Sequence, residues 1–264
     1  MPIRKVVPTF REAVADIPDG ATLFLDGFGG PGGMPHFLIL ALWEHGAKNL
    51  TIISNTAGIA MAAGFGMPGS KRYIDHSILI ENGQVRKVIA SFPVTANPSV
   101  MSAAERAWRE GKLEIETVPQ GTLVERIRAG GAGIAAFYTP TGVGTLLEQG
   151  KEKRVFNGRE YVLETALTAD YAFIRAWRAD RLGNLVYRGT SRNFNAVMAT
   201  AARITIAEVD EVVEPGVLDP DHVHTPAVYV KRIVVRPQDE TPILAETYER
   251  LRQQRAGQGN LSSR

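Results

Sequence analysis

The sequence of 264 residues contains no cysteine, which excludes disulfide bonds, thiolate metal sites and a cysteine nucleophile within this chain. Its formal net charge is only +2, which argues against a nucleic-acid-binding surface. No apolar run approaches the roughly 20 residues of a membrane-spanning helix. The N-terminal residues MPIRKVVPTF also lack the apolar core of a signal peptide. We therefore expect a cytoplasmic protein that binds neither nucleic acid nor a membrane.

The composition is that of an ordinary globular protein, with 44% hydrophobic and 22% charged residues. A chain of this length can bury a large core as one domain. Because the sequence becomes polar after Pro237, we expect one domain over residues 1–236 and a polar extension over residues 237–264. Within that extension, Leu244 to Gln253 has the character of a short helix.

The first quarter of the chain predicts a strand, helix and strand in succession. Ala21 to Leu25 is a short apolar run, and an apolar run of helical length follows a glycine-rich stretch. Pro35 suits the first turn of that helix and Gly46 its C-terminal cap. Leu50 to Ile53 is a second apolar run. This order is typical of an α/β fold with a largely parallel sheet flanked by helices.

Later segments predict further strands, one helix and hairpin additions to the sheet. Asn82-Gly83 and Asn157-Gly158 are dipeptides that favour two-residue hairpin turns. We expect hairpins around both, the first from Ser77 to Ile89 and the second from Arg154 to Glu164. A helix over Asn193–Ala202, a buried strand over Ile204–Val209 and a half-exposed edge strand over Val228–Val235 follow.

The middle of the chain, from Pro119 to Thr145, is rich in glycine. Thr122 is placed to cap a short helix, Leu123 to Ala129, with Gly130 just after its end. Glycines beside apolar runs suggest backbone that a ligand or another chain approaches closely. The alternative is a set of tight turns in a large α/β domain.

Two segments fall at the carboxyl ends of the first two predicted strands, where ligands bind in parallel α/β sheets. They comprise Gly27, Phe28, Gly29, Gly30, Pro31, Gly32 and Gly33 after the first strand, and Ser54, Asn55 and Thr56 after the second. The glycine spacing is not G-x-G-x-x-G, and no acidic residue ends the second strand, so a dinucleotide site is not favoured. We expect close backbone approach to another phosphate-bearing or acyl ligand.

Three further features have competing interpretations. The segment Asp219 to His224 contains metal-ligand residue types, but its prolines favour a rigid turn, and we expect no metal. The arginines between Arg175 and Arg192 lie near acidic residues, which favours buried or interface salt bridges over a nucleic-acid surface. Gln120 is either a turn residue or a neutral amide donor that stabilises a developing oxyanion.

Several long motifs resemble the A (alpha) chain of the family I CoA-transferases, of the 3-oxoacid (succinyl-CoA:3-ketoacid) type. They are PDGATLFLDGFGGPGGMP, PQGTLVERIRAGGAGIAAFYTPTGVGT, FNGREYVLETALTADYAFIRAWRADRLGNLVYRGTSRNFN, AEVDEVVEPGVLDPDHVHTP and YVKRIV. The resemblance extends from about Ile17 to Val235.

The resemblance implies a heteromeric enzyme, a heterodimer or heterotetramer, that moves CoA between an acyl-CoA and a carboxylic acid. In this family a glutamate of the beta-type partner, in an S-E-N-G motif, is the nucleophile of a ping-pong cycle, and no cofactor is needed beyond the CoA thioester substrate. Gln120 matches the oxyanion-stabilising glutamine of the family's P-Q-G-T motif. Glu81 lies in a superficially similar I-E-N-G sequence, but serine is missing, so we expect it to be an ordinary hairpin residue.

The sequence departs from the family pattern mainly around the expected acyl pocket. Asp26 replaces a glycine of the first loop, Thr56 an asparagine, and Ala135 a proline, while Ser91 to Val94 read S-F-P-V in place of S-Y-V-G. The identity of the acyl group therefore stays open. The alternatives are a partner-dependent acyl-CoA hydrolase and, from another class, a non-catalytic CoA-binding or regulatory protein.

Overall fold

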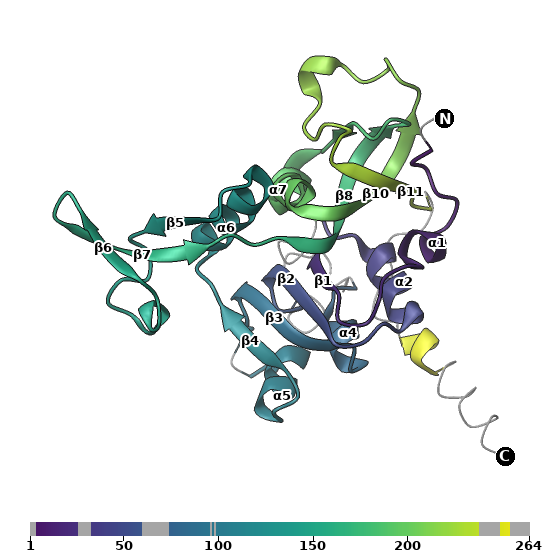
Figure 1. Cartoon of the computed structure of the whole chain (residues 1–264). Coiled ribbons are helices and arrows are strands. Elements are labelled where there is room, and N and C mark those ends of the chain that lie inside the picture. The colour runs from purple at the N-terminus through teal and green to yellow at the C-terminus, as the bar shows by residue number, and fades with distance from the viewer. Residues whose placement is uncertain are drawn as a thin grey trace.

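Seven parallel strands form the central sheet of this computed structural model, which describes residues 4–25, 33–59, 74–95, 97, 99–237 and 249–253 (Figure 1). From one edge to the other they are β11 (Val230–Val235), β10 (Ala202–Val213), β8 (Ala169–Asp180), β1 (Thr22–Leu25), β2 (Leu50–Thr56), β3 (Val85–Phe92) and β4 (Glu114–Thr117). A short strand, β9 (Leu185–Val186), pairs antiparallel with β8. The predicted parallel α/β class is confirmed.

Helices cover both faces of this sheet. Successive residues of each strand point to opposite sides, so a strand made of consecutive apolar residues presents an apolar surface on each face. Leu23 and Leu25 belong to one apolar cluster, whereas Phe24 belongs to the other. The first cluster includes residues of α1 (Phe10–Val14), α2 (His36–His45), α4 (Ser77–Glu81) and α5 (Ala103–Arg109). The second includes residues of α6 (Gln120–Ala132) and α7 (Asn193–Ala201).

A small antiparallel sheet projects from this body as an arm (Figure 1). Its strands are, in spatial order, β5 (Ala136–Thr139), β7 (Arg159–Thr165) and β6 (Lys153–Phe156), with a 3-10 turn, η2 (Leu146–Glu148), between β5 and β6. Asn157 and Gly158 have φ of 50° and 75°, as a type I′ turn requires, so this predicted hairpin is confirmed.

The other predicted hairpin is wrong. Asn82-Gly83 joins α4 to β3, and β3 runs parallel to β2 rather than antiparallel to a neighbour. Asn82 caps α4 by donating its backbone N–H to Ile78 O, and Gly83 takes the left-handed φ of 67° that ends the turn. The dipeptide therefore ends a helix here, because its tolerance of positive φ suits a helix end as well as a hairpin.

The predicted bounds of the middle helix are also wrong. α6 begins at Gln120 and continues through Gly130 and Gly131 to its cap at Gly133, which has φ of 73°. A Cβ on Gly130 would lie 2.1 Å from Leu167 O, and one on Gly131 would lie 2.2 Å from Thr200 Oγ1. Other groups therefore approach these two glycines closely, but they belong to the chain itself and not to the predicted ligand or second chain.

The predicted rigid turn at Asp219 to His224 is confirmed. Asp219 caps the 3-10 turn η4 (Pro220–His222), as expected of a rigid turn, and a further 3-10 turn, η3 (Gly189–Arg192), precedes α7. Residues 249–253 are helical, and the rest of the predicted C-terminal helix lies outside the described residues. Among the described residues, no helix combines the length and apolar character needed to span a membrane.

Candidate active site

The carboxyl ends of the parallel strands define one edge of the sheet. Phe24 of β1 pairs with Ile53 of β2, and Leu25 pairs with Phe173 of β8. Ser54 pairs in turn with Ala90 of β3. Residues that follow these positions therefore lie at the same edge, where a parallel α/β sheet presents its ligand site.

Gln120 and Asn55 meet at this edge. Gln120 follows β4 as the first residue of α6, and Asn55 lies near the end of β2. Gln120 Nε2 donates a hydrogen bond to Asn55 Oδ1 at 2.9 Å. An amide nitrogen carries two hydrogens, and among the described residues the second hydrogen of Gln120 Nε2 has no acceptor, so it can donate to a ligand. The structure thus brings two residues that are 65 positions apart into one amide pair.

The N-terminus of α6 adds a positive partial charge beside Gln120. The first N–H groups of a helix have no intrahelical acceptor, and the helix dipole places partial positive charge there. Pro119 is the N-cap of α6 and makes no side-chain cap, so these groups keep their donor capacity. The Gln120 side chain is solvent-exposed, and it therefore stands where an entering ligand meets both the amide and the helix end.

Ser54, Asn55 and Thr56 belong to β2 itself, whereas the sequence predicted a loop after the strand. Ser54 is fully buried, and Asn55 and Thr56 are each 5% exposed. The hydroxyls of Ser54 and Thr56 have no hydrogen-bond partner within the described part of the chain. Such buried polar groups are rare in folded proteins, and a catalytic role or a bound water or ion is a usual explanation for them.

The end of β2 is fixed from the α4 side. Buried His76 lies with Nε2 3.0 Å from Thr56 O, and because a carbonyl can only accept, Nε2 carries the proton. Burial lowers the pKa of His76, so the ring is neutral. Gly58 has φ of 73°, and a Cβ there would lie 2.7 Å from Ser77 N. Only glycine allows the chain to leave β2 so close to α4.

Of the predicted glycine-rich site, one residue lies within the described part of the chain. Gly27, Phe28, Gly29, Gly30, Pro31 and Gly32 lie outside the described residues. Gly33 adopts φ of 107°, in the region that favours glycine. Its carbonyl accepts a hydrogen bond of 3.2 Å from Asn195 Nδ2, so the end of the stretch is tied to α7.

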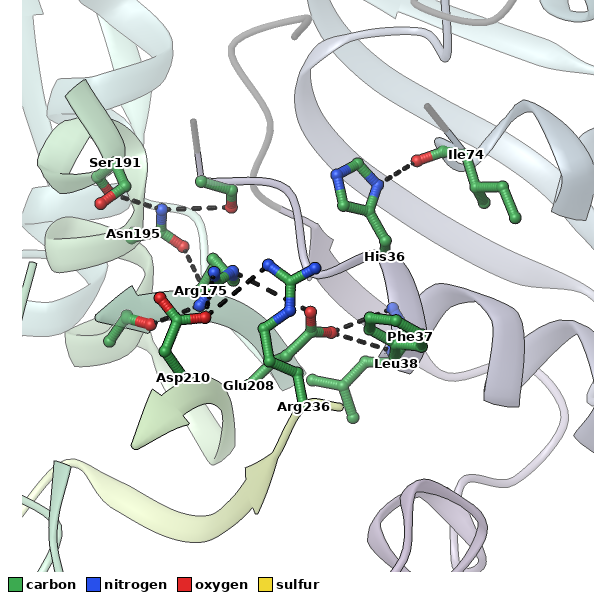
Figure 2. A network of polar contacts seen from close by, with 12 residues as sticks. His36, Phe37, Leu38, Ile74, Arg175, Ser191, Asn195, Glu208, Asp210 and Arg236 are labelled. Atoms are coloured by element: carbon green, nitrogen blue, oxygen red, sulfur yellow. Dashed lines mark hydrogen bonds and ion pairs between the residues drawn. The ribbon is translucent and has the colours of Figure 1, made fainter. Parts of the chain in front are cut away.

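A buried polar network lies between α2 and the strands β8 and β10 (Figure 2). Glu208 of β10 is fully buried, and its Oε2 accepts hydrogen bonds from Phe37 N and Leu38 N at the start of α2. Burial raises the pKa of Glu208 to about 7, and Arg175 and Arg236 oppose that rise. Sequence reasoning missed this network, although one acidic residue inside the apolar run of a buried strand was a usable signal.

His36 begins α2 and is also buried. Burial lowers its pKa to about 3, so the imidazole is neutral at physiological pH. Its Nδ1 lies 2.5 Å from Ile74 O, which accepts, so Nδ1 carries the proton. The start of α2 is thereby linked to the segment that precedes α4.

Three arginines of the cluster form salt bridges as predicted, but only the Arg175 side chain is largely buried. Ion pairs of 2.6 Å join Arg175 to Asp210, Arg178 to Glu211 and Arg181 to Glu214 across β8 and β10 and the residue that follows each. Arg178 and Arg188 also lie over the Trp177 ring, at 4.3 and 5.6 Å from its centroid. Within the described residues, no group of three or more His, Asp or Glu side chains is placed to hold a metal ion.

Glu81 lies away from the amide pair. It is the last residue of α4, forms an ion pair of 3.9 Å with Arg106, and lines a surface hollow with Gly83 and Val85. Val85 is the amino end of β3, whereas Gln120 follows the carboxyl end of β4. The geometry therefore gives Glu81 no place beside the amide and hydroxyl groups of the candidate site.

These features define an α/β protein whose ligand edge carries an amide pair, buried hydroxyls and a helix N-terminus. Comparison with known proteins identifies it further. A family model described as coenzyme A transferase matches residues 7–236. The chain belongs to the coenzyme A transferase family, as the A-type (alpha) chain of a two-chain enzyme, and the resemblance predicted from its motifs is confirmed.

Two curated relatives illustrate this membership. The chain is 47% identical over 255 residues to the A chain of a probable succinyl-CoA:3-ketoacid coenzyme A transferase of Bacillus subtilis (strain 168), covering 97% of this chain and 98% of that protein. It is 48% identical over 235 residues to the A chain of a 3-oxoadipate CoA-transferase of Pseudomonas putida, covering 88% of this chain and 94% of that protein.

Solved structures share the fold. An acyl-CoA transferase of Escherichia coli O157:H7 superposes with a TM-score of 0.78 at 26% identity, over 92% of this chain and 49% of that chain. This chain thus spans about half of that longer enzyme. The glutaconate coenzyme A-transferase of Acidaminococcus fermentans, at 20% identity and a TM-score of 0.73, covers 88% of this chain and 76% of its own and supports the fold alone.

Proposed function

We propose that this chain, assembled with a beta-type partner, transfers CoA between an acyl-CoA and a free 3-oxo acid by a ping-pong mechanism. The observation that carries the proposal is the Gln120–Asn55 amide pair at the N-terminus of α6. This arrangement suits the stabilisation of negative charge on a carbonyl oxygen. The names of the relatives, which pair succinyl-CoA with a 3-ketoacid or specify 3-oxoadipate, support the choice of substrates.

The nucleophile in this proposal is a glutamate of the beta-type partner. Its carboxylate attacks the acyl-CoA carbonyl and expels CoA thiolate, which leaves a mixed anhydride. The thiolate then attacks the glutamyl carbonyl, releases the first carboxylic acid as its carboxylate and forms a glutamyl-CoA thioester. The acceptor carboxylate attacks this thioester, and the released thiolate attacks the acyl carbonyl of the new anhydride. The cycle ends with a new acyl-CoA and the regenerated glutamate.

Gln120 acts in each of these steps, because each passes through a tetrahedral state with negative charge on the former carbonyl oxygen. The hydrogen of Nε2 that does not bind Asn55 donates to that oxygen. Asn55 holds the amide in this orientation through its 2.9 Å hydrogen bond. Because the donor is neutral, it favours the developing oxyanion without forming an ion pair with the substrate carboxylate. Every step is an attack on an acyl carbonyl, so the reaction needs no metal ion or redox cofactor.

The substrate edge is completed by the groups beside Asn55. Ser54 and Thr56 present buried hydroxyls on the α2 face of the sheet, the face shared by Ile52. We assign them to contacts with the acyl or pantetheine part of the substrate, since hydrogen bonds to a ligand would satisfy groups that the described chain leaves without partners. The glycine-rich stretch that ends at Gly33 is assigned to close backbone contact with the same ligand.

The test is co-expression of this chain with the reading frame that encodes an S-E-N-G-containing partner, followed by purification of the complex. Succinyl-CoA is offered with acetoacetate and, in a parallel arm, with 3-oxoadipate, and product acyl-CoA is followed by chromatography. We expect CoA transfer by the complex and none by either chain in isolation. Release of free CoA without an acceptor would identify a hydrolase, and activity of the purified chain alone would refute the assignment of the nucleophile to the partner.

A further inference from the structure

Asn195 of α7 fixes the backbone at the end of the glycine-rich stretch. Its side chain is fully buried, and Nδ2 donates to Gly33 O at 3.2 Å and to Ser191 O at 2.7 Å. Its Oδ1 accepts a hydrogen bond of 2.7 Å from Arg175 N of β8. One neutral side chain, drawn in Figure 2 with Ser191 and Arg175, therefore ties Gly33 to both α7 and the central sheet.

Glu208 of β10 fixes the first turn of α2. Pro35, the N-cap of α2, provides no side-chain cap. Glu208 Oε2 supplies the missing acceptor from another element, at 3.0 Å from Phe37 N and 3.2 Å from Leu38 N. The start of α2 is thereby anchored to a strand that follows it by about 170 residues.

Arg175 joins the two contacts. Its backbone binds Asn195, and its Nε lies 4.0 Å from Glu208 Oε1. Its Nη2 pairs with Asp210 at 2.6 Å, and Arg236 Nη1 lies 3.7 Å from the same carboxylate. We call Asn195, Arg175 and Glu208 the α2 anchor.

Capping α2 with the buried carboxylate of Glu208 has a large desolvation cost. A fully buried carboxylate loses its hydration, and burial raises the pKa of Glu208 to about 7 for this reason. Its Oε1 accepts no hydrogen bond from any described residue. A serine or aspartate at the N-cap position would have capped α2 locally. Because a local cap would avoid this desolvation cost, we infer that the contact between Glu208 and α2 serves to position the helix.

The anchor lies beside the candidate active site. Phe173 of β8 pairs with Leu25 of β1, and Arg175 lies two residues further along β8. By the register of β1 with β2, Thr56 of β2 lies at the same level in the sheet as Arg175. The strands β8 and β2 are separated by β1, and strands in a sheet lie about 4.8 Å apart, which places Arg175 and Thr56 at backbone positions roughly 10 Å apart. Arg175, Glu208 and Thr56 also share the α2 face of the sheet, by strand alternation.

We propose that Asn195 and Glu208 are positioning residues for CoA transfer, which hold Gly33 and the first turn of α2 in one place beside the substrate edge. The proposal rests on the proposed function, because it assumes that Gly33 and the first turn of α2 lie against the CoA substrate. Neither residue contacts the reacting atoms. Their loss should therefore weaken substrate binding in the ground state and in the transition state alike, which raises KM and spares kcat.

The kinetic test compares four variants of the assembled complex. Asn195→Ala removes the Gly33 contact, Glu208→Leu removes the acceptor from α2, and Glu208→Gln keeps an acceptor oxygen. Glu211→Gln is the matched control, because Glu211 lies on the same strand and pairs with Arg178 without touching α2. We expect KM for acyl-CoA to rise about tenfold or more in Asn195→Ala, which loses three hydrogen bonds, and in Glu208→Leu, which loses two. Glu208→Gln and the control should stay within about twofold of the wild type.

Amide hydrogen exchange tests the anchor without any activity assay. In the full-length chain, Asn195→Ala and Glu208→Leu should accelerate exchange over residues 33–38 by about tenfold, with no comparable change in the peptides of α5. Because Glu208 binds a proton more tightly in the fold than in water, ionisation favours opening of the α2 start. Corrected for intrinsic exchange, wild-type opening should increase about tenfold from pH 6 to pH 8.5, given a pKa of about 7. Glu208→Gln should remove this dependence.

The charged groups around Glu208 support the assignment of that pH profile. Arg175 faces it from β8, Arg236 from the end of β11, and Asp210 from its own strand through Arg175. His36 of α2 does not titrate in this range, because burial lowers its pKa to about 3.

Unchanged exchange over residues 33–38 in both Asn195→Ala and Glu208→Leu would overturn the anchor. Faster exchange with unchanged KM would show an anchor that serves stability alone, and would overturn its role in the reaction. If no complex transfers CoA, the proposed function fails and takes the role in the reaction with it, while the exchange experiment still decides the existence of the anchor.

Discussion

Replacement of Gln120 by alanine should lower the turnover of the assembled complex while leaving its structure intact. The side chain is exposed and begins α6, where alanine is a good helix former. The hydrogen bond to Asn55 that is lost should cost about 0.5 to 1.5 kcal/mol of stability. The removed N–H donor should matter far more to the reaction, since one oxyanion donor typically contributes about a hundred- to a thousand-fold, or ~3 to 4 kcal/mol.

Gln120→Glu is the sharper companion variant. A carboxylate at the N-terminus of α6 interacts favourably with the helix dipole, by about 0.3 to 1 kcal/mol, so the fold should not weaken. The same anion repels a developing oxyanion, and the activity should be no higher than that of the alanine variant. Stability and turnover should therefore move in opposite directions, which a general disruption of the site would not produce.

The assay is steady-state kinetics of CoA transfer by the complex, with gel filtration and circular dichroism to confirm assembly and fold. Glu125→Gln is a matched control, since Glu125 lies on the same helix in an exposed pair with Arg128. We expect kcat to fall in both Gln120 variants and to stay within about twofold in the control. A near-normal kcat in Gln120→Ala would refute the role of the amide and direct attention to backbone donors or to the partner chain.

Three further results are expected. Glu81→Gln should change turnover by no more than a few-fold, because Glu81 lies towards the amino edge of the sheet; a loss of several orders of magnitude in an intact complex would contradict this. Gly130→Ala should destabilise the chain by about 1 to 3 kcal/mol in urea unfolding, because its Cβ would meet Leu167 O, whereas Gly121→Ala, with open space around it, should stabilise by about 0.5 to 1 kcal/mol. The pKa of Glu208 is about 7 in the fold and 4.5 ordinarily, so the stability that its protonated form contributes is lost as pH rises between these values. The Tm of Glu208→Gln relative to the wild type should therefore rise over that pH range, and a constant difference in Tm would contradict this.

Local patterns in the sequence determined the fold class and most of its elements. The apolar runs at Ala21 to Leu25 and Leu50 to Ile53, with a capped helix between them, became the parallel pair β1 and β2. The Asn157-Gly158 turn formed as predicted, because the backbone preference of these two residues decides a hairpin by itself. The long motifs also indicated the family, since they preserve residues over most of the chain.

The same kind of local signal failed where two structures satisfy it equally. Asn82-Gly83 tolerates the positive φ of a hairpin turn and of a helix end, and the pairing of β3 with β2 chose the second. Gly130 suits a helix cap, but the approach of Leu167 required glycine within the helix instead. In each case a distant segment decided the outcome, and a local pattern contains no information about that segment.

The candidate site was decided partly by sequence and partly by the tertiary structure. The sequence identified Gln120 and Asn55 separately, the first by its motif and the second by its place after an apolar run. Their contact depends on the order of strands in the sheet, which brings the start of α6 back to the end of β2. Asn195 and Glu208 gained their roles only from packing, because the groups they bind are about 160 to 170 residues away. The sequence supplied the chemical groups, and the parallel sheet placed them at one edge.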